Sequence, residues 1–128
     1  MIDFMVLGLP RSGTAWLANL LTTDTSLCLH ESFMTTTIQE LDELEKSQGH
    51  LLGICETSGL FIADEINNHP SQKVIIERPL HEINFSLARI GFPLMPDETI
   101  KLLKNLEGYR IAFEDLFDYQ KISFVYEQ

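Results

Sequence analysis

The sequence has few basic residues: nine lysines and arginines stand against nineteen aspartates and glutamates, giving a formal net charge of -10. So large an excess of negative charge repels nucleic acids and anionic membranes, and we expect neither as a partner. No apolar run approaches the roughly 20 residues that span a bilayer, and the first residues lack the regions of a signal peptide. These absences predict a cytoplasmic protein.

Cysteine is scarce as well. Cys28 and Cys55 lie in apolar segments without the spacing of metal ligands, so we expect reduced thiols in the core and no metal site. The 128 residues, 45% of them hydrophobic, are enough to bury one core. We therefore expect a single domain over residues 1–128.

Apolar residues alternate between the spacing of strands and that of helices. Strands are expected at residues 3–7, 27–29, 52–55, 73–77 and 110–113. Helices are expected from 12 to about 22, 37–48, 60–67, 79 to about 90, and 97–106, the last capped by Asp97. This order predicts an α/β fold of three layers, with a mainly parallel five-stranded sheet, helices on both faces and ligands at the carboxyl ends of the strands. Residues 121–128 alternate in hydropathy and indicate an edge strand or a truncated element.

The first expected strand runs into a glycine loop, residues 8–14. Gly8 and Gly13 allow the backbone to approach an anion closely, and the following helix adds the positive end of its dipole. Arg11 can offer a bidentate guanidinium to phosphate or sulfate oxygens, while Ser12 and Thr14 can add hydroxyl donors. The alternative is a glycine-rich turn in which Arg11 is merely solvated.

This loop departs from that of the nucleoside-triphosphate-binding P-loop proteins, in which Lys and then Ser or Thr follow the second glycine. Gly-Leu-Pro-Arg-Ser-Gly-Thr-Ala-Trp-Leu, residues 8–17, instead resembles the 5′-phosphosulfate loop of the sulfotransferases that use 3′-phosphoadenosine 5′-phosphosulfate (PAPS). The resemblance implies a P-loop-type fold and PAPS, or its product adenosine 3′,5′-bisphosphate (PAP), as the ligand. It assigns cofactor binding to Pro10, Arg11, Ser12, Gly13, Thr14, Ala15 and Trp16. Ala15 stands where the family often has a second threonine.

Two later segments resemble the same family in the same order. Arg78 ends a strand and Ser86 follows eight residues later on an expected helix, as in the family's 3′-phosphate site. In many members one residue separates the arginine from the proline, whereas Pro79 follows Arg78 directly. The alternative is an Arg78 that pairs with a nearby glutamate beside a coincidental serine. Residues 110–116 resemble a late strand of the family that ends in Tyr-Glu-Asp-Leu, with Phe113 in place of the tyrosine.

Sulfuryl transfer needs a base for the acceptor proton and positive charge for the leaving phosphate, and it needs no metal. Arg11 is expected to stabilise the leaving group. Glu31 is the first candidate for the base and His30 the second, because both lie at the end of the second expected strand. The alternative is that His30 orients the strand end while Glu31 pairs with Arg11.

We therefore expect a sulfotransferase that acts on a hydroxyl or amine of a small-molecule or carbohydrate acceptor. Members of the family are usually much longer, so this chain is expected to be a minimal member, to act as a homo-oligomer, or to bind nucleotide without turnover. A kinase-like nucleotide-binding protein and a non-catalytic anion-binding module are the alternatives.

Overall fold

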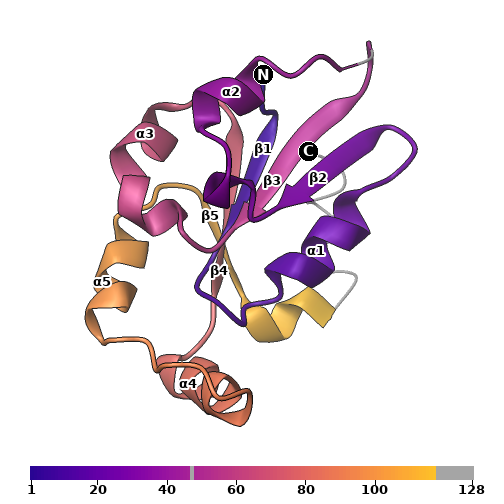
Figure 1. Ribbon diagram of the computed structural model, residues 1–128. Helices are drawn as coiled ribbons and strands as arrows, with labels where there is room; N and C mark the ends of the chain where they lie inside the picture. The colour runs from indigo at the N-terminus through magenta and orange to yellow at the C-terminus, as the bar shows by residue number, and fades with distance from the viewer. Residues whose placement is uncertain (47, 118–128) are drawn as a thin grey trace.

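A computed structural model of the protein describes residues 1–46 and 48–117, and its centre is a five-stranded sheet (Figure 1). All pairings between neighbouring strands are parallel, and the strand order is β2-β3-β1-β4-β5. The strands are β1 (Phe4–Leu7), β2 (Ser26–His30), β3 (Leu51–Glu56), β4 (Gln72–Glu77) and β5 (Tyr109–Ala112). The expected parallel sheet is confirmed.

Helices cover both faces of this sheet. The α-helices are α1 (Thr14–Leu21), α2 (Ile38–Asp42), α3 (Ala63–Asn68), α4 (Leu80–Arg89) and α5 (Glu98–Lys104), and the 3-10 helices are η1 (Ser32–Met34), η2 (Gly59–Ile62) and η3 (Phe113–Phe117). One buried cluster joins α1 and η3 to one face of the sheet, and a second joins α2, α3, α4 and α5 to the other. The chain therefore folds as the expected three-layer α/β protein.

The central strand β1 shows how the sequence builds these two cores. Met5 and Leu7 point into the cluster with α3 and α5, whereas Val6 points into the cluster with α1. All three side chains are at most 1% exposed, because strands of a doubly covered sheet are apolar on both faces. The Phe4 ring lies across β3, where a Cβ on Gly53 would sit 2.0 Å from the ring. A glycine is therefore required at position 53.

Two sequence expectations about helices are wrong. The helix expected over residues 37–48 ends at Asp42, because acidic side chains at 43 and 45 are unfavourable at the negative end of a helix dipole. Asp97 precedes α5 as expected, but its side chain makes no capping hydrogen bond, since its own backbone is already helical. Residues 121–128, for which an edge strand or truncated element was expected, lie outside the described residues.

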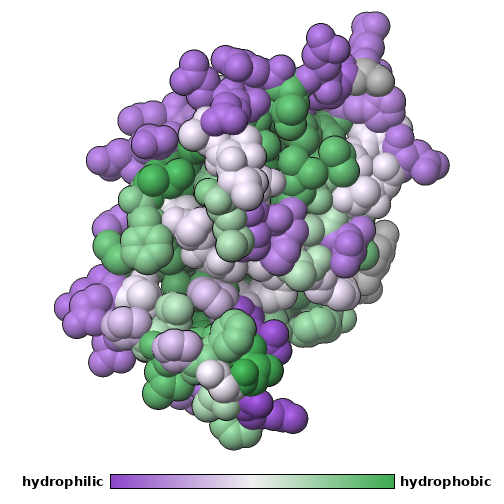
Figure 2. Space-filling view, in the orientation of Figure 1, coloured by the Kyte–Doolittle hydropathy of each residue, from purple (hydrophilic) through white to green (hydrophobic). Residues whose placement is uncertain are grey.

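The two ends of the sheet differ in what surrounds them. Hydrophilic side chains gather around α2 and the start of β1, at the top of the view in Figure 2. Apolar side chains are exposed around α4, at the other end, among them Phe85, Ile90, Phe92 and Leu94. Within the described part of the chain, no helix is long and apolar enough to cross a membrane. The two cysteines are buried and form no disulfide, as expected, and their sulfur atoms share a hydrogen bond of 3.3 Å.

Candidate functional site

The loop between β1 and α1 has the backbone geometry of an anion cradle. Arg11 has a φ of 65° and Gly13 a φ of 82°, so two residues of the loop adopt the left-handed conformation. For the arginine this conformation is strained, which is characteristic of functional loops. Gly13 packs so closely on η3 that a Cβ would lie 3.1 Å from Leu116, so both its φ and its surroundings require glycine.

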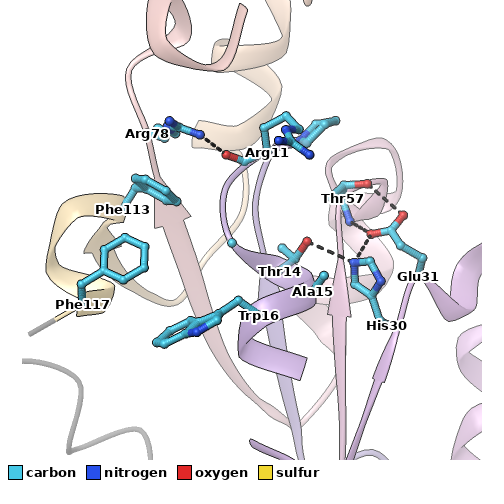
Figure 3. A pocket seen from close by; sticks show the side chains of 12 residues that line it. Arg11, Thr14, Ala15, Trp16, His30, Glu31, Thr57, Arg78, Phe113 and Phe117 are labelled. Atoms are coloured by element: carbon cyan, nitrogen blue, oxygen red, sulfur yellow. Dashed lines mark hydrogen bonds and ion pairs between the residues drawn. The ribbon is translucent and has the colours of Figure 1, made fainter. Parts of the chain in front are cut away.

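A pocket of about 540 Å³ opens over this loop at the carboxyl ends of the strands (Figure 3). Leaving Ser86 aside, the sequence nominated ten residues for cofactor binding or catalysis. Nine of them line this pocket: Pro10, Arg11, Gly13, Thr14, Ala15, Trp16, His30, Glu31 and Arg78. Thr57, Phe113 and Phe117 complete the lining. Ser12, the tenth, does not line the pocket: it is fully buried and its hydroxyl has no hydrogen-bond partner.

Arg78 is held against the loop by two contacts. Its Nη1 donates a hydrogen bond to the backbone carbonyl of Arg11, and its guanidinium lies 4.0 Å from the centre of the Phe113 ring. The glutamate partner expected in the structural alternative is present as well, because Arg78 Nε lies 3.6 Å from a carboxylate oxygen of Glu82. The Glu82 side chain is exposed, so solvent screens the pair and its contribution to stability is small.

Ser86 lies in a second pocket, of about 460 Å³, that shares Arg11 and Arg78 with the first. Its hydroxyl accepts a hydrogen bond of 2.8 Å from Arg11 Nε. Arg89, one turn further along α4, brings a third guanidinium to this pocket. In a protein with nine basic residues, three of them therefore line two adjoining pockets. A local positive site exists in spite of the global negative charge.

His30 and Glu31 lie on the opposite side of the larger pocket, where β2 ends (Figure 3). His30 Nε2 is 3.3 Å from the Thr14 hydroxyl and 3.8 Å from a Glu31 oxygen. The Glu31 carboxylate accepts hydrogen bonds from the Thr57 amide, at 2.8 Å, and the Thr57 hydroxyl, at 2.9 Å. Glu31 itself has a φ of 56°, a second strained non-glycine residue at this end of the sheet. The expected alternative, Glu31 paired with Arg11, does not occur.

A second carboxyl group, Glu56, lies at the end of β3 beside Glu31. Its side chain is fully buried, and one oxygen accepts a hydrogen bond of 3.2 Å from the Phe33 amide. Its other oxygen has no hydrogen-bond partner. Burial and the nearby charge of Glu31 raise the pKa of Glu56 to about 7, although the amides of Phe33 and Ser32 act in the opposite direction.

Aromatic rings form the remaining wall of the larger pocket. Trp16 and Phe117 lie with their ring centres 5.4 Å apart, and Phe113 packs edge-on against Phe117 at 5.5 Å. Trp16 and Phe117 are exposed, at 40% and 65%. Large exposed rings beside a cationic loop can bind the flat face of an aromatic ligand.

Several residues in or beside these pockets were not nominated from the sequence. Thr57 and Glu56 follow from the rule that nominated His30 and Glu31, because they come directly after the neighbouring expected strand. Arg89 lies three residues after Ser86, the spacing that places two side chains on one helix face. Phe113 was expected to end a strand, whereas it begins η3 and lines the larger pocket.

Comparisons of the chain with models of protein families, with curated proteins and with solved structures found no match.

Proposed function

We propose that this protein binds PAPS and transfers its sulfuryl group to a hydroxyl or amine of a small-molecule or carbohydrate acceptor. The observation that carries the proposal is the pair of adjoining pockets that share Arg11 and Arg78. A nucleoside 3′,5′-bisphosphate presents two separate anions, and it needs two cationic sites at the same time. ATP presents a single chain of phosphates and has no group for the pocket at Ser86.

The residues divide naturally between the two anions. The 5′-phosphosulfate is assigned to the loop, where the amides around Gly13, the Thr14 hydroxyl and the start of α1 favour negative charge. The 3′-phosphate is assigned to the second pocket, with Ser86 and Arg89 as its donors. Arg11 and Arg78 lie between the two, and the aromatic wall of Trp16 and Phe117 is assigned to the adenine base.

The chemistry supplied by PAPS is an activated sulfuryl group whose leaving group is a phosphate. Glu31 takes the proton of the acceptor hydroxyl or amine, and its two hydrogen bonds from Thr57 fix the orientation of the carboxylate. Arg11 and the loop amides stabilise the charge that grows on the leaving phosphate. His30, the second candidate for the base, is close enough to Thr14 to orient its hydroxyl.

Magnesium-dependent transfer from ATP is the weaker proposal, because Thr14 and Ala15 follow Gly13 where such loops have Lys and then Ser or Thr. Glu56 ends β3, the strand paired with β1, and its full burial leaves it unavailable to a solvated metal.

Calorimetry with PAP, adenosine 5′-phosphate and ATP with Mg²⁺ tests the binding. We expect PAP to bind best, and Arg78→Ala to remove most of the preference for PAP over adenosine 5′-phosphate. Lys101→Ala, which removes one positive charge from the exposed face of α5, is the matched control and should keep the preference. All affinities must be measured on folded protein at one salt concentration. Equal losses for both ligands would contradict the role of Arg78.

Turnover is tested separately with sulfur-labelled PAPS and a panel of neutral, amine and carbohydrate acceptors. Transfer that is lost in Glu31→Gln while PAP affinity is retained supports the assigned base. Tight PAP binding without transfer to any acceptor would favour the non-catalytic binding module.

A further inference from the structure

Glu31 and Glu56 each form hydrogen bonds with the segment that follows the other's strand. The carboxylate of Glu31, which follows β2, accepts from the amide and hydroxyl of Thr57, which follows β3. In return, the carboxyl of Glu56, at the end of β3, accepts from the Phe33 amide in η1, just after β2. Each side chain therefore fixes the turn that follows the other strand, including the turn at which Glu31 takes up its strained backbone.

The two carboxyl groups differ in the partners they have. Both oxygens of Glu31 accept hydrogen bonds, so a negative charge there is well stabilised. Glu56 is fully buried and one of its oxygens has no partner, so an ionised Glu56 would leave a charged oxygen without hydrogen bonds in the protein interior. A proton on that oxygen removes this cost.

We propose that Glu56 is a positioning residue that carries the proton of this carboxyl pair on one oxygen, while its other oxygen accepts from the Phe33 amide and holds the turn of η1. The site then holds one negative charge beside the loop instead of two. When Glu56 loses its proton, a second negative charge appears at the end of β3. This strand end contacts the loop directly, because the backbone carbonyl of Glu56 accepts a hydrogen bond of 3.2 Å from the amide of Gly8, the first residue of the loop. Deprotonation therefore opposes anion binding.

The surroundings of Glu56 support this assignment. Glu31 is the charged group that faces it from the end of β2, and the amides of Ser32 and Phe33 face it from η1. Cys55, the preceding residue of β3, contributes a buried thiol whose pKa is raised by its hydrogen bond with Cys28, by burial and by the nearby carboxylates. Of these neighbours, only the two amides favour an ionised Glu56, and the pKa near 7 places the change within the neutral range.

The first test is independent of any ligand. The backbone amide of Phe33 reports on Glu56 through its hydrogen bond, so its NMR chemical shift should titrate with a midpoint near pH 7 in the wild type. Glu56→Gln keeps the shape of the neutral carboxyl and should abolish that titration. Glu45→Gln, the same change on an exposed residue, should leave it intact. A midpoint near the ordinary glutamate value of about 4.3 in the wild type would overturn the proposal without the need for any variant.

The second test rests on the proposed function and measures PAP affinity between about pH 6 and about pH 8.5. Titration of the ligand itself is common to both proteins, so only the difference in affinity between the proteins is informative. We expect the wild type to lose at least about threefold more affinity than Glu56→Gln as the pH rises, since a nearby charge acts through a partly screened medium. Parallel pH profiles for the two proteins would overturn the effect on anion binding. If PAP does not bind at all, the proposed function fails while the Phe33 titration still decides the role of Glu56.

Discussion

The carboxyl and amino ends of the sheet differ in backbone strain and in the pairing of their polar groups. At the carboxyl end, Arg11 and Glu31 are strained, and polar oxygens of Ser12 and Glu56 are buried without hydrogen-bond partners. No other non-glycine residue among those described has a positive φ. Such features destabilise a fold and are retained where a ligand or a reaction uses them.

At the amino end, the polar groups around Asp42 are paired instead. The Asp42 carboxylate accepts from the Ile2 amide at 2.8 Å and from His69 Nε2 at 3.0 Å. His69 Nδ1 accepts a hydrogen bond from the Ser71 amide, so the ring hydrogen is on Nε2. Nε2 therefore donates the hydrogen bond to the Asp42 carboxylate. This cluster ties α2, the start of β1 and the approach to β4 together. We infer that the amino end holds the fold and that the carboxyl end holds the site.

The largest expected effect is that of removing Asp42, which tests whether the amino end of the sheet stabilises the fold independently of the site. Asp42→Ala leaves the Ile2 amide and His69 without their acceptor, and we expect it to lower the free energy of unfolding by about 3 kcal/mol, as for two bonds to a charged group. Denaturant unfolding measures this loss. PAP affinity of the protein that remains folded should be unchanged, and Asp24→Ala, at an exposed turn, should have almost no effect on either quantity. A large loss of PAP affinity would show that the two ends are not separate.

The second prediction is that the two ends respond to pH with opposite signs. Burial acts to raise the pKa of Asp42, but the bonds from Ile2 and His69 outweigh it, so the pKa is lowered. At Asp3 burial is likewise outweighed, by the bonds from Lys46 and the Leu52 amide. These two groups stabilise the fold above their unfolded-state pKa of 3.8, and this stability is lost as the pH falls through their lower folded-state values.

Glu56 has the opposite shift, from 4.5 to about 7, so its contribution is fully present below pH 4.5 and is lost as the pH rises to about 7. Stability should therefore rise up to about pH 4.5 and then decline by about 2 kcal/mol, less than the roughly 3 kcal/mol of a rigid site. Denaturation at a series of pH values measures both limbs. Glu56→Gln should remove the decline and keep the rise; a decline that survives this substitution would contradict the assignment to Glu56.

The strands and most of the residues at the candidate site could be predicted from the sequence, whereas contacts that depend on the folded backbone could not. Short apolar runs predicted the strands, and the rule that parallel strands end at one edge brought Arg11, His30 and Arg78 together. The bond between Arg11 and Ser86 was beyond prediction, because it joins residues 75 apart and depends on the left-handed backbone of Arg11. Glu56 comes directly after the third expected strand, but its burial and its bond to the Phe33 amide depend on the turn after β2, which the sequence pattern does not define.

The third prediction concerns Arg11, whose strained backbone should lower stability while its side chain contributes to binding. Arg11→Gly relieves a backbone conformation that glycine adopts freely, so the free energy of unfolding should rise by about 0.5 to 1 kcal/mol. The same change removes the guanidinium shared by both pockets and should weaken PAP binding by about 1.5 to 3 kcal/mol. Arg11→Ala separates the two effects, since it loses the same binding energy without relief of the backbone. Chemical denaturation and calorimetry on all three proteins provide the comparison; an unchanged PAP affinity in the folded variants would contradict the role of Arg11.

The smallest expected effect concerns Ala15, which is exposed in the first turn of α1 and lines the larger pocket. A hydroxyl at this position adds one donor beside the loop amides, so Ala15→Thr should tighten PAP binding by up to about 1 kcal/mol, the usual net value of one hydrogen bond. Threonine lowers helix propensity by several tenths of a kcal/mol, so stability should fall slightly. Ala15→Val is the matched control, because valine has the shape of threonine and the same cost in a helix but no hydroxyl. Calorimetry should therefore rank threonine above alanine and valine for PAP, and denaturation should place threonine and valine together below alanine. If valine tightens binding as much as threonine, the gain comes from packing in the pocket, and the loop does not use a hydroxyl at position 15 to bind the anion.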